Sequence, residues 1–251
     1  MVKKKLKELL HPLIIRLGYQ NIEPVVEQSL LEHFFQTIQA MEFNPNHIVD
    51  VGANHGNWTR TALKYFPQSQ YTLLEPQKWL EKNISDLLNT NSKVKFFPFG
   101  AGSSKGTFKF TLLERDDSSN FLLSESEAKQ MGLKQIDVDV ITLNEFLPTV
   151  SSQSPDIIKI DAEGLDLQVL NGSSNFFGNT EIFIVEAGVG SKYIKNDITT
   201  VIEFMKQRNY RLFEITDLNR PFSLGVLWLM ELVFVRENGF IHSKVLTLGI
   251  E

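Results

Sequence analysis

The feature that most constrains this sequence is an apolar, β-branched run that ends in an acid and a glycine-rich turn. The run His47–Val51 leads into Gly52-Ala-Asn-His-Gly56, then a helical pattern, then a second apolar run that ends in Glu75. Glycine lacks a Cβ, so Gly52 and Gly56 let the backbone adopt positive φ and approach a ligand closely. Glu75 stands at a strand's carboxyl end, where it can accept hydrogen bonds from both hydroxyls of a ribose. The pattern predicts a strand–turn–helix–strand unit that holds a nucleoside-bearing cofactor.

The glycine spacing indicates which cofactor. It is G-x-x-x-G from Gly52 to Gly56, whereas dinucleotide-binding turns carry G-x-G-x-x-G so that a pyrophosphate meets a bare helix N-terminus. A cofactor without phosphates does not need the third glycine. We therefore expect S-adenosylmethionine, and an NAD-linked oxidoreductase is the alternative that the missing glycine disfavours.

Other residues near the turn complete the expected cofactor site. Asp50 ends the first strand, where its carboxylate can take the ammonium of a methionine moiety, directly or through water; the alternative is an aspartate that caps the turn. Phe97–Gly102 ends the third strand, and its small residues would let a purine lie against the backbone. The predicted cofactor-binding residues are Asp50, Gly52, Asn54, Gly56, Glu75, Pro76, Gly100 and Ala101.

A second motif, Asp156–Gly164, brings two acids to the end of a buried strand. Burying acids costs free energy unless they are paired or reach solvent, so Asp161 and Glu163 indicate a cleft. Either acid could accept a proton from a hydroxyl, or hold a cation that lowers the pKa of that hydroxyl. The alternative is that they cap the following helix. We predict Asp161 and Glu163 as catalytic residues; a divalent metal is possible but no metal ligands are predicted.

Polar residues elsewhere converge on the same edge. Glu186 ends a further apolar run, so four predicted strands deliver Asp50, Glu75, Asp161 and Glu186 to one edge of a sheet. A polar insertion, residues 114–131, could close over a substrate. The predicted acceptor-binding residues are His55, Ser119, Asn120, Lys159 and Glu186.

Alternating strand and helix patterns predict an α/β fold with a mostly parallel sheet of seven strands. The expected strands span 47–52, 70–75, 94–99, 156–161, 181–186, 210–215 and 226–236, and the expected helices 57–66, 78–89, 166–177 and 197–208. The last strand has no room for a crossover before it, so it should pair antiparallel, as in the methyltransferase variant of the Rossmann-like fold. Runs 107–113 and 136–143 should form an antiparallel pair. Residues 1–45 are expected to be an N-terminal helical extension and residues 46–251 the methyltransferase domain.

Bulk properties limit the class of protein. The net charge of −5 gives no basic field for nucleic acid, and the absence of cysteine excludes disulfides and thiolate sites. No apolar run reaches the length of a membrane span. Four lysines precede an apolar stretch in residues 1–18, which we expect to be a solvated helix packed on the domain; weak peripheral membrane contact is the alternative. No signal peptide is expected, and the location should be cytoplasmic.

These motifs together resemble the FkbM-type S-adenosylmethionine-dependent methyltransferases over residues 46–236. The similar segments are Asp50–Gly56, Glu75-Pro76, Lys159–Gly164, Val169–Gly172, Val185-Glu186 and Leu227–Val235. The resemblance implies cofactor contacts at Asp50, Gly52 and Glu75, and O-methylation of a hydroxyl on a sugar, glycan or secondary metabolite. His55 and Glu231 depart from the usual residues. A non-catalytic module that kept this fold is a further alternative, which the intact Asp50 and Asp161 disfavour.

Overall fold

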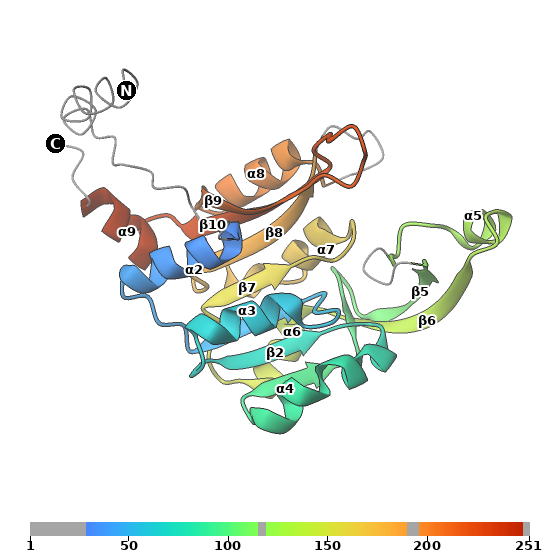
Figure 1. The fold of residues 1–251 in the computed structure, drawn as a ribbon, viewed down its shortest axis with the longest axis horizontal. Helices are drawn as coiled ribbons and strands as arrows, with labels where there is room; N and C mark the ends of the chain where they lie inside the picture. Colours follow the sequence, from blue (N-terminus) through green and yellow to red (C-terminus); the bar gives the residue numbers. More distant parts are fainter. Residues whose placement is uncertain (1–28, 115–118, 190–195, 248–251) are drawn as a thin grey trace, which may run out of the picture.

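The computed structural model describes residues 29–114, 119–189 and 196–247, and its centre is a seven-stranded sheet (Figure 1). The strand order is β3-β2-β1-β7-β8-β10-β9. The strands are β1 (His47–Val51), β2 (Gln70–Leu74), β3 (Val94–Phe97), β7 (Ile157–Ile160), β8 (Ile182–Gly188), β9 (Tyr210–Asn219) and β10 (Leu229–Arg236). Strand β10 runs antiparallel to both β8 and β9, and the other pairs of this sheet are parallel. The predicted fold class is confirmed.

Helices cover both faces of the sheet, because alternate residues of each buried strand point to opposite sides. The helices are α2 (Leu30–Ala40), α3 (Asn57–Tyr65), η1 (Lys78–Ile84), α4 (Ser85–Thr90), α6 (Leu143–Val150), α7 (Asp166–Asn171), η3 (Ser174–Phe176), α8 (Ile198–Lys206) and α9 (Phe240–Thr247). In β1, Ile48 packs in the cluster that contains residues of α2, α3 and α9, whereas Val49 packs in the cluster that contains residues of α6, α7 and α8. The sequence patterns did not predict α6 or α9.

A three-stranded sheet projects from the domain as an arm, at the right of Figure 1. It contains β4 (Gly100–Ala101), β5 (Gly106–Leu112) and β6 (Lys134–Ile141), with α5 (Glu125–Gln130) at its outer end. Strands β5 and β6 are antiparallel, as predicted. Ser124 and Glu127 form a capping box that starts α5. The arm thus contains most of the predicted insertion; residues 115–118 lie outside the described residues.

The described part of the predicted N-terminal extension packs into the main core. Helix α2 buries Phe34, Phe35 and Ile38 completely, and the Phe35 ring contacts Trp58 of α3 edge-on at 5.5 Å. The predicted basic helix in residues 1–18 lies outside the described residues. Among the residues described, no helix is long and apolar enough to cross a membrane.

Two predicted elements end earlier than expected, each for a local reason. The predicted helix 166–177 stops at Asn171, and a Cβ on the following residue, Gly172, would lie 2.0 Å from the Gly102 carbonyl oxygen. The chain therefore crosses close to the end of the arm there and continues as η3. The predicted strand 94–99 ends at Phe97, beyond which the chain leaves for the second sheet at Gly100.

Candidate active site

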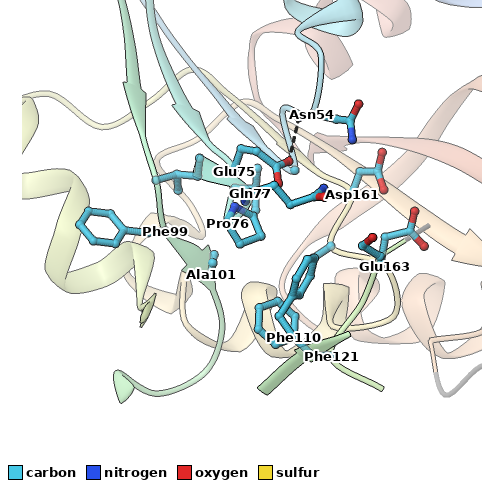
Figure 2. A pocket seen from close by; sticks show the side chains of 16 residues that line it. Asn54, Glu75, Pro76, Gln77, Phe99, Ala101, Phe110, Phe121, Asp161 and Glu163 are labelled. Carbon is cyan, nitrogen blue, oxygen red and sulfur yellow. Dashed lines mark hydrogen bonds between the residues drawn. The ribbon is translucent and has the colours of Figure 1, made fainter. Parts of the chain in front are cut away.

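The first cavity of the candidate site lies at the carboxyl ends of β1, β2 and β7 (Figure 2). It has about 560 Å³ of empty volume, part of it open to solvent. Of the sequence-predicted residues, it is lined by Gly52, Asn54, Glu75, Pro76, Gly100, Ala101, Ser119, Asp161 and Glu163.

The glycine-rich turn after β1 is held by short-range constraints. Gly52 has φ +74°, and a Cβ there would lie 1.8 Å from the Asp161 carbonyl oxygen, so only glycine fits. Asn54 also has positive φ, +45°, and its backbone N–H donates to Glu75 Oε2 at 2.9 Å. Gly56, at φ +73°, begins α3 as its N-cap residue. The turn is thereby fixed to the end of β2.

Glu75 presents a nearly buried carboxylate to this cavity. It is 3% exposed, and its Oε1 accepts the backbone N–H of Gln77 at 2.9 Å. Burial raises the pKa of Glu75, while the N–H groups of Gln77 and Asn54 act in the opposite direction. Each carboxylate oxygen can accept more than one hydrogen bond, so Glu75 retains capacity to accept from ligand hydroxyls.

Apolar side chains form much of the remaining wall of the first cavity. Figure 2 shows Pro76, Ala101, Phe110 and Phe121 around the space beside Glu75. The rings of Phe110 and Phe121 pack at 4.7 Å between centroids. Aromatic and proline surfaces beside a carboxylate can bind a flat base next to a polyhydroxyl group.

A buried lysine links the first turn to the acid of the second motif. Lys159 Nζ donates to the Gly52 carbonyl oxygen at 3.1 Å and to Asp161 Oδ2 at 3.2 Å, and it lies 3.3 Å from Asp50 Oδ1. Asp50 Oδ2 accepts the hydroxyl of Thr59 at 2.6 Å. Burial opposes the charge of Lys159, but Asp161 and Asp50 outweigh it and raise the pKa of the lysine.

The structure buries two predicted site residues, Asp50 and Lys159. Asp50 is completely buried and lines none of the three cavities of the site. Lys159 was predicted to bind the acceptor; in the structure it pairs with two acids and lines the second cavity. The helix-capping alternative for Asp161 is not what the structure shows, since the N-cap residue of α7 is Leu165 and no side chain caps this helix. Asp166, not Asp161, accepts the N–H groups of Ala162 and Gly164.

Asp161 also lines two further cavities. The second is bounded by the N-terminal ends of α2 and α3 and by β9 and β10; it includes His55, Trp58, Lys159, Asp217 and Glu231. The third lies between the β9–β10 hairpin and the arm, and it includes Asn120, Glu163, Glu186, Asp217 and Trp228. Asp161 therefore stands where all three cavities meet. Gly56 lines none of them.

Sequence reasoning missed several lining residues. Gln77, Phe99, Phe110 and Phe121 line the first cavity, and Asp217, Trp228 and Glu231 line the others. Phe108 and Phe110 lie two residues apart on a predicted strand and therefore share one face, which was a signal for an aromatic surface there; Phe110 is the buried member of the pair. Glu163 has φ +47°, an unusual conformation for a non-glycine residue and one that clusters at functional sites. Among the described residues, no three His, Asp or Glu side chains converge as metal ligands.

Comparison with known proteins assigns the chain to a family. The model of the methyltransferase FkbM domain matches residues 50–212. The chain belongs to this family. It is 26% identical over 189 residues to methyltransferase sdnD of Sordaria araneosa, covering 62% of this chain and 73% of that protein. It is also 26% identical over 144 residues to methyltransferase 1 of Beauveria bassiana, covering 50% and 57%.

The FkbM assignment agrees with the fold. The crystal structure of methyltransferase FkbM from Methylobacillus flagellatus superposes with a TM-score of 0.50 at 15% identity, covering 76% of this chain and 43% of that one. The chain thus spans less than half of that protein and somewhat more than half of the Beauveria relative. The protein is an FkbM-family methyltransferase with a Rossmann-like fold, and the family membership displaces the oxidoreductase alternative.

Proposed function

We propose that this FkbM methyltransferase uses S-adenosylmethionine to methylate a hydroxyl group of a sugar, glycan or secondary metabolite. The observation that carries the proposal is the position of Asp161, which lines the first cavity and the two cavities beside it. A carboxylate at that junction can reach both a bound cofactor and an acceptor.

The residues of the first cavity fit the cofactor. Glu75 supplies a carboxylate for ribose hydroxyls, and Pro76, Phe110 and Phe121 supply apolar surface for adenine. A Cβ at Gly100 would lie 3.0 Å from the ring of Phe121, so a larger residue would crowd this wall. When bound, S-adenosylmethionine supplies an electrophilic methyl group on a sulfonium.

The protein's own contribution is to orient the acceptor and to take its proton. Asp161 and Glu163 line both the first and the third cavity, so an acceptor in the third cavity can place a hydroxyl against either carboxylate. Lys159 fixes one oxygen of Asp161 and leaves the other for the acceptor. Holding the two reactants in line supplies most of the rate enhancement in such a transfer, and the carboxylate assists deprotonation.

The expected partners follow from charge. The net charge of −5 and the acids around Asp161 disfavour nucleic acid as an acceptor. We keep a cytoplasmic location as part of the proposal, together with weak membrane contact by residues 1–18 as an alternative to a solvated helix.

The test is direct. Calorimetry should show binding of S-adenosylhomocysteine and none of NAD, and mass spectrometry of incubations with S-adenosylmethionine and candidate glycans should show a gain of one methyl on oxygen. Absence of adenosyl-ligand binding would reject the cofactor. Binding without methylation of any acceptor class would favour the non-catalytic module.

A further inference from the structure

The third cavity has a composition that selects among acceptors. It has about 970 Å³ of empty volume and shares Asp161 and Glu163 with the first cavity. Its wall also includes Glu186, Asp217, Asn219 and the half-buried Trp228. No lysine or arginine is among the described residues that line it. A ligand there meets four carboxyl groups and an aromatic ring.

The acids form a row across four strands. Glu231 of β10 is paired with Glu186 of β8 on one side and with Asp217 of β9 on the other. Asp161 and Glu186 both follow the last paired position of β7 and β8, Ile160 with Val185, so they lie level. Like charges directly opposite each other destabilise a sheet. Lys159 is hydrogen-bonded to Asp161 and interacts favourably with the charge of Glu231, but its single positive charge offsets only part of the row.

Glu186 and Asp217 are the members of the row without a side-chain hydrogen bond or ion pair among the described residues, and Glu186 is the less exposed of the two. The side chain of Glu186 is partly buried and makes no hydrogen bond or ion pair within the described part of the chain. Burial, followed by the charges of Asp161, Asp166 and Glu163, raises the pKa of Glu186 well above its usual range. A buried carboxyl group without a partner costs free energy, and a cationic ligand would offset that cost.

The geometry favours an organic cation over a metal ion. The four carboxyl groups are distributed around the cavity and do not form a group of three metal ligands among the described residues. A metal requires ligand oxygens at a common short distance. An ammonium group needs only a few acceptors and gains from an adjacent indole ring through a cation–π contact.

We propose that the acceptor carries a protonated amine, which the third cavity binds among Glu186, Asp217 and Trp228 while it excludes phosphorylated and carboxylated acceptors. The inference rests on the proposed function, because it takes the third cavity to be the place of the acceptor. It narrows the acceptor class to amino sugars and related amino alcohols.

Three probes with the same sugar ring test the charge requirement. Glucosamine carries the ammonium, N-acetylglucosamine replaces it by a neutral amide, and glucose has a hydroxyl there. Calorimetry on the enzyme saturated with S-adenosylhomocysteine should show glucosamine binding at least ~10-fold more tightly than the other two, since hydrogen bonds to charged groups contribute that much. Glu186→Gln should remove most of this preference. The control Glu203→Gln, an exposed acid on α8 with the same charge change, should keep it.

Proton release is a second readout. A bound cation favours the ionised form of Glu186, so glucosamine binding should release protons at pH values where the free enzyme holds this carboxyl group protonated. The release is detected as a dependence of the binding heat on the buffer, and Glu186→Gln should abolish it. Unaltered S-adenosylhomocysteine affinity checks that the variant is folded. Equal affinity for the three probes, no detectable glucosamine binding, or a preference that survives Glu186→Gln would overturn the proposal.

Product analysis separates this inference from the proposed function. Methyl transfer to an oxygen of an amine-bearing acceptor supports both. Transfer to the nitrogen would reject O-methylation but uphold the amine requirement. Efficient O-methylation of neutral acceptors, with amine-bearing ones no better, would uphold the function and reject the inference.

Discussion

Lys159 and Asp161 are hydrogen-bonded at 3.2 Å, yet the lysine side chain is 5% exposed and the aspartate side chain 36%. The buried ammonium group therefore fixes the carboxylate of Asp161, which lines the cavities. Its other anchor is Asp50, which is completely inaccessible to solvent. One buried charge thus connects the end of β1 with the end of β7, two adjacent strands from distant parts of the sequence.

Replacing this lysine should destabilise the protein. Lys159→Met leaves Asp50 buried without a counter-charge, so the free energy of unfolding should fall by about 3–5 kcal/mol, the usual cost of breaking a buried pair. Urea titration measures it. The exposed Lys78→Met is the matched control, and adding Asp50→Asn to Lys159→Met should restore part of the loss. A loss below ~1 kcal/mol in Lys159→Met would contradict the buried network.

Removing the charge of Asp161 should affect turnover more than cofactor binding. Asp161→Asn keeps the shape but loses a proton acceptor, so turnover should fall by ~10²-fold or more. Affinity for S-adenosylhomocysteine should stay within a few-fold by calorimetry. The exposed Asp139→Asn on β6 is the control. Near-normal turnover in Asp161→Asn would remove it from the chemistry, and loss of activity with EDTA that Mg²⁺ restores would assign the acids to a metal.

Glu75 should control cofactor affinity. Glu75→Gln replaces one acceptor oxygen by a donor facing the N–H groups of Asn54 and Gln77, and it weakens any bond to ribose hydroxyls. We expect a loss of roughly 1.5–3 kcal/mol in S-adenosylhomocysteine binding, measured by calorimetry. Glu81→Gln, on the exposed side of η1, should bind normally. Equal affinities of the two variants would rule out a ribose-binding role.

The free energy of unfolding should fall as pH rises from about 4.5 to about 7, because Glu231 ionises in that range. Burial outweighs Lys159 and Thr216 and raises the pKa of Glu231 to about 7. The folded state therefore binds this proton more tightly than the unfolded state, so the contribution is complete below about pH 4.5 and is lost as pH rises to about 7.

Glu231→Gln should flatten that dependence. The change is at most about 3 kcal/mol, because each pKa unit corresponds to about 1.4 kcal/mol and Glu231 is partly accessible from the second cavity. Urea unfolding at several pH values between 5 and 8 measures it, with Glu203→Gln as the control. A pH profile that Glu231→Gln leaves unchanged would mean that Glu231 ionises normally.

Patterns along the chain were enough to predict the sheet. The apolar runs around Ile48, Leu73, Ile158 and Ile184 are long, bounded by turn residues and buried on both faces, so the strands and their alternation with helices follow from periodicity. The antiparallel last strand followed from the short connection before it. Helix α9 has a weaker apolar pattern, and its burial depends on Ile241 meeting the core from a distant part of the chain.

The sequence predicts which residues stand at the strand ends around the site, but it does not predict which of them are buried. Position at strand ends placed Asp161, Glu163 and Glu75 around a cavity, yet the same rule placed Asp50 there, and it is buried. Which acid faces solvent depends on where Lys159 and Thr59 reach, and these contacts are tertiary. The cross-strand pairs of Glu231 depend on register, which the sequence of one strand does not fix.

The β9–β10 hairpin contributes to the third cavity and not to the first, so the two cavities can change independently. It contributes Trp228 and Asp217 to the third cavity, but none of its residues lines the first. Its tip between Asn219 and Leu229 exposes Phe222, Leu224 and Val226, so its length and composition can vary without disturbing the core. An enzyme built this way can acquire a new acceptor by exchanging one loop while it keeps its cofactor, and a collection of FkbM proteins could diversify by that route.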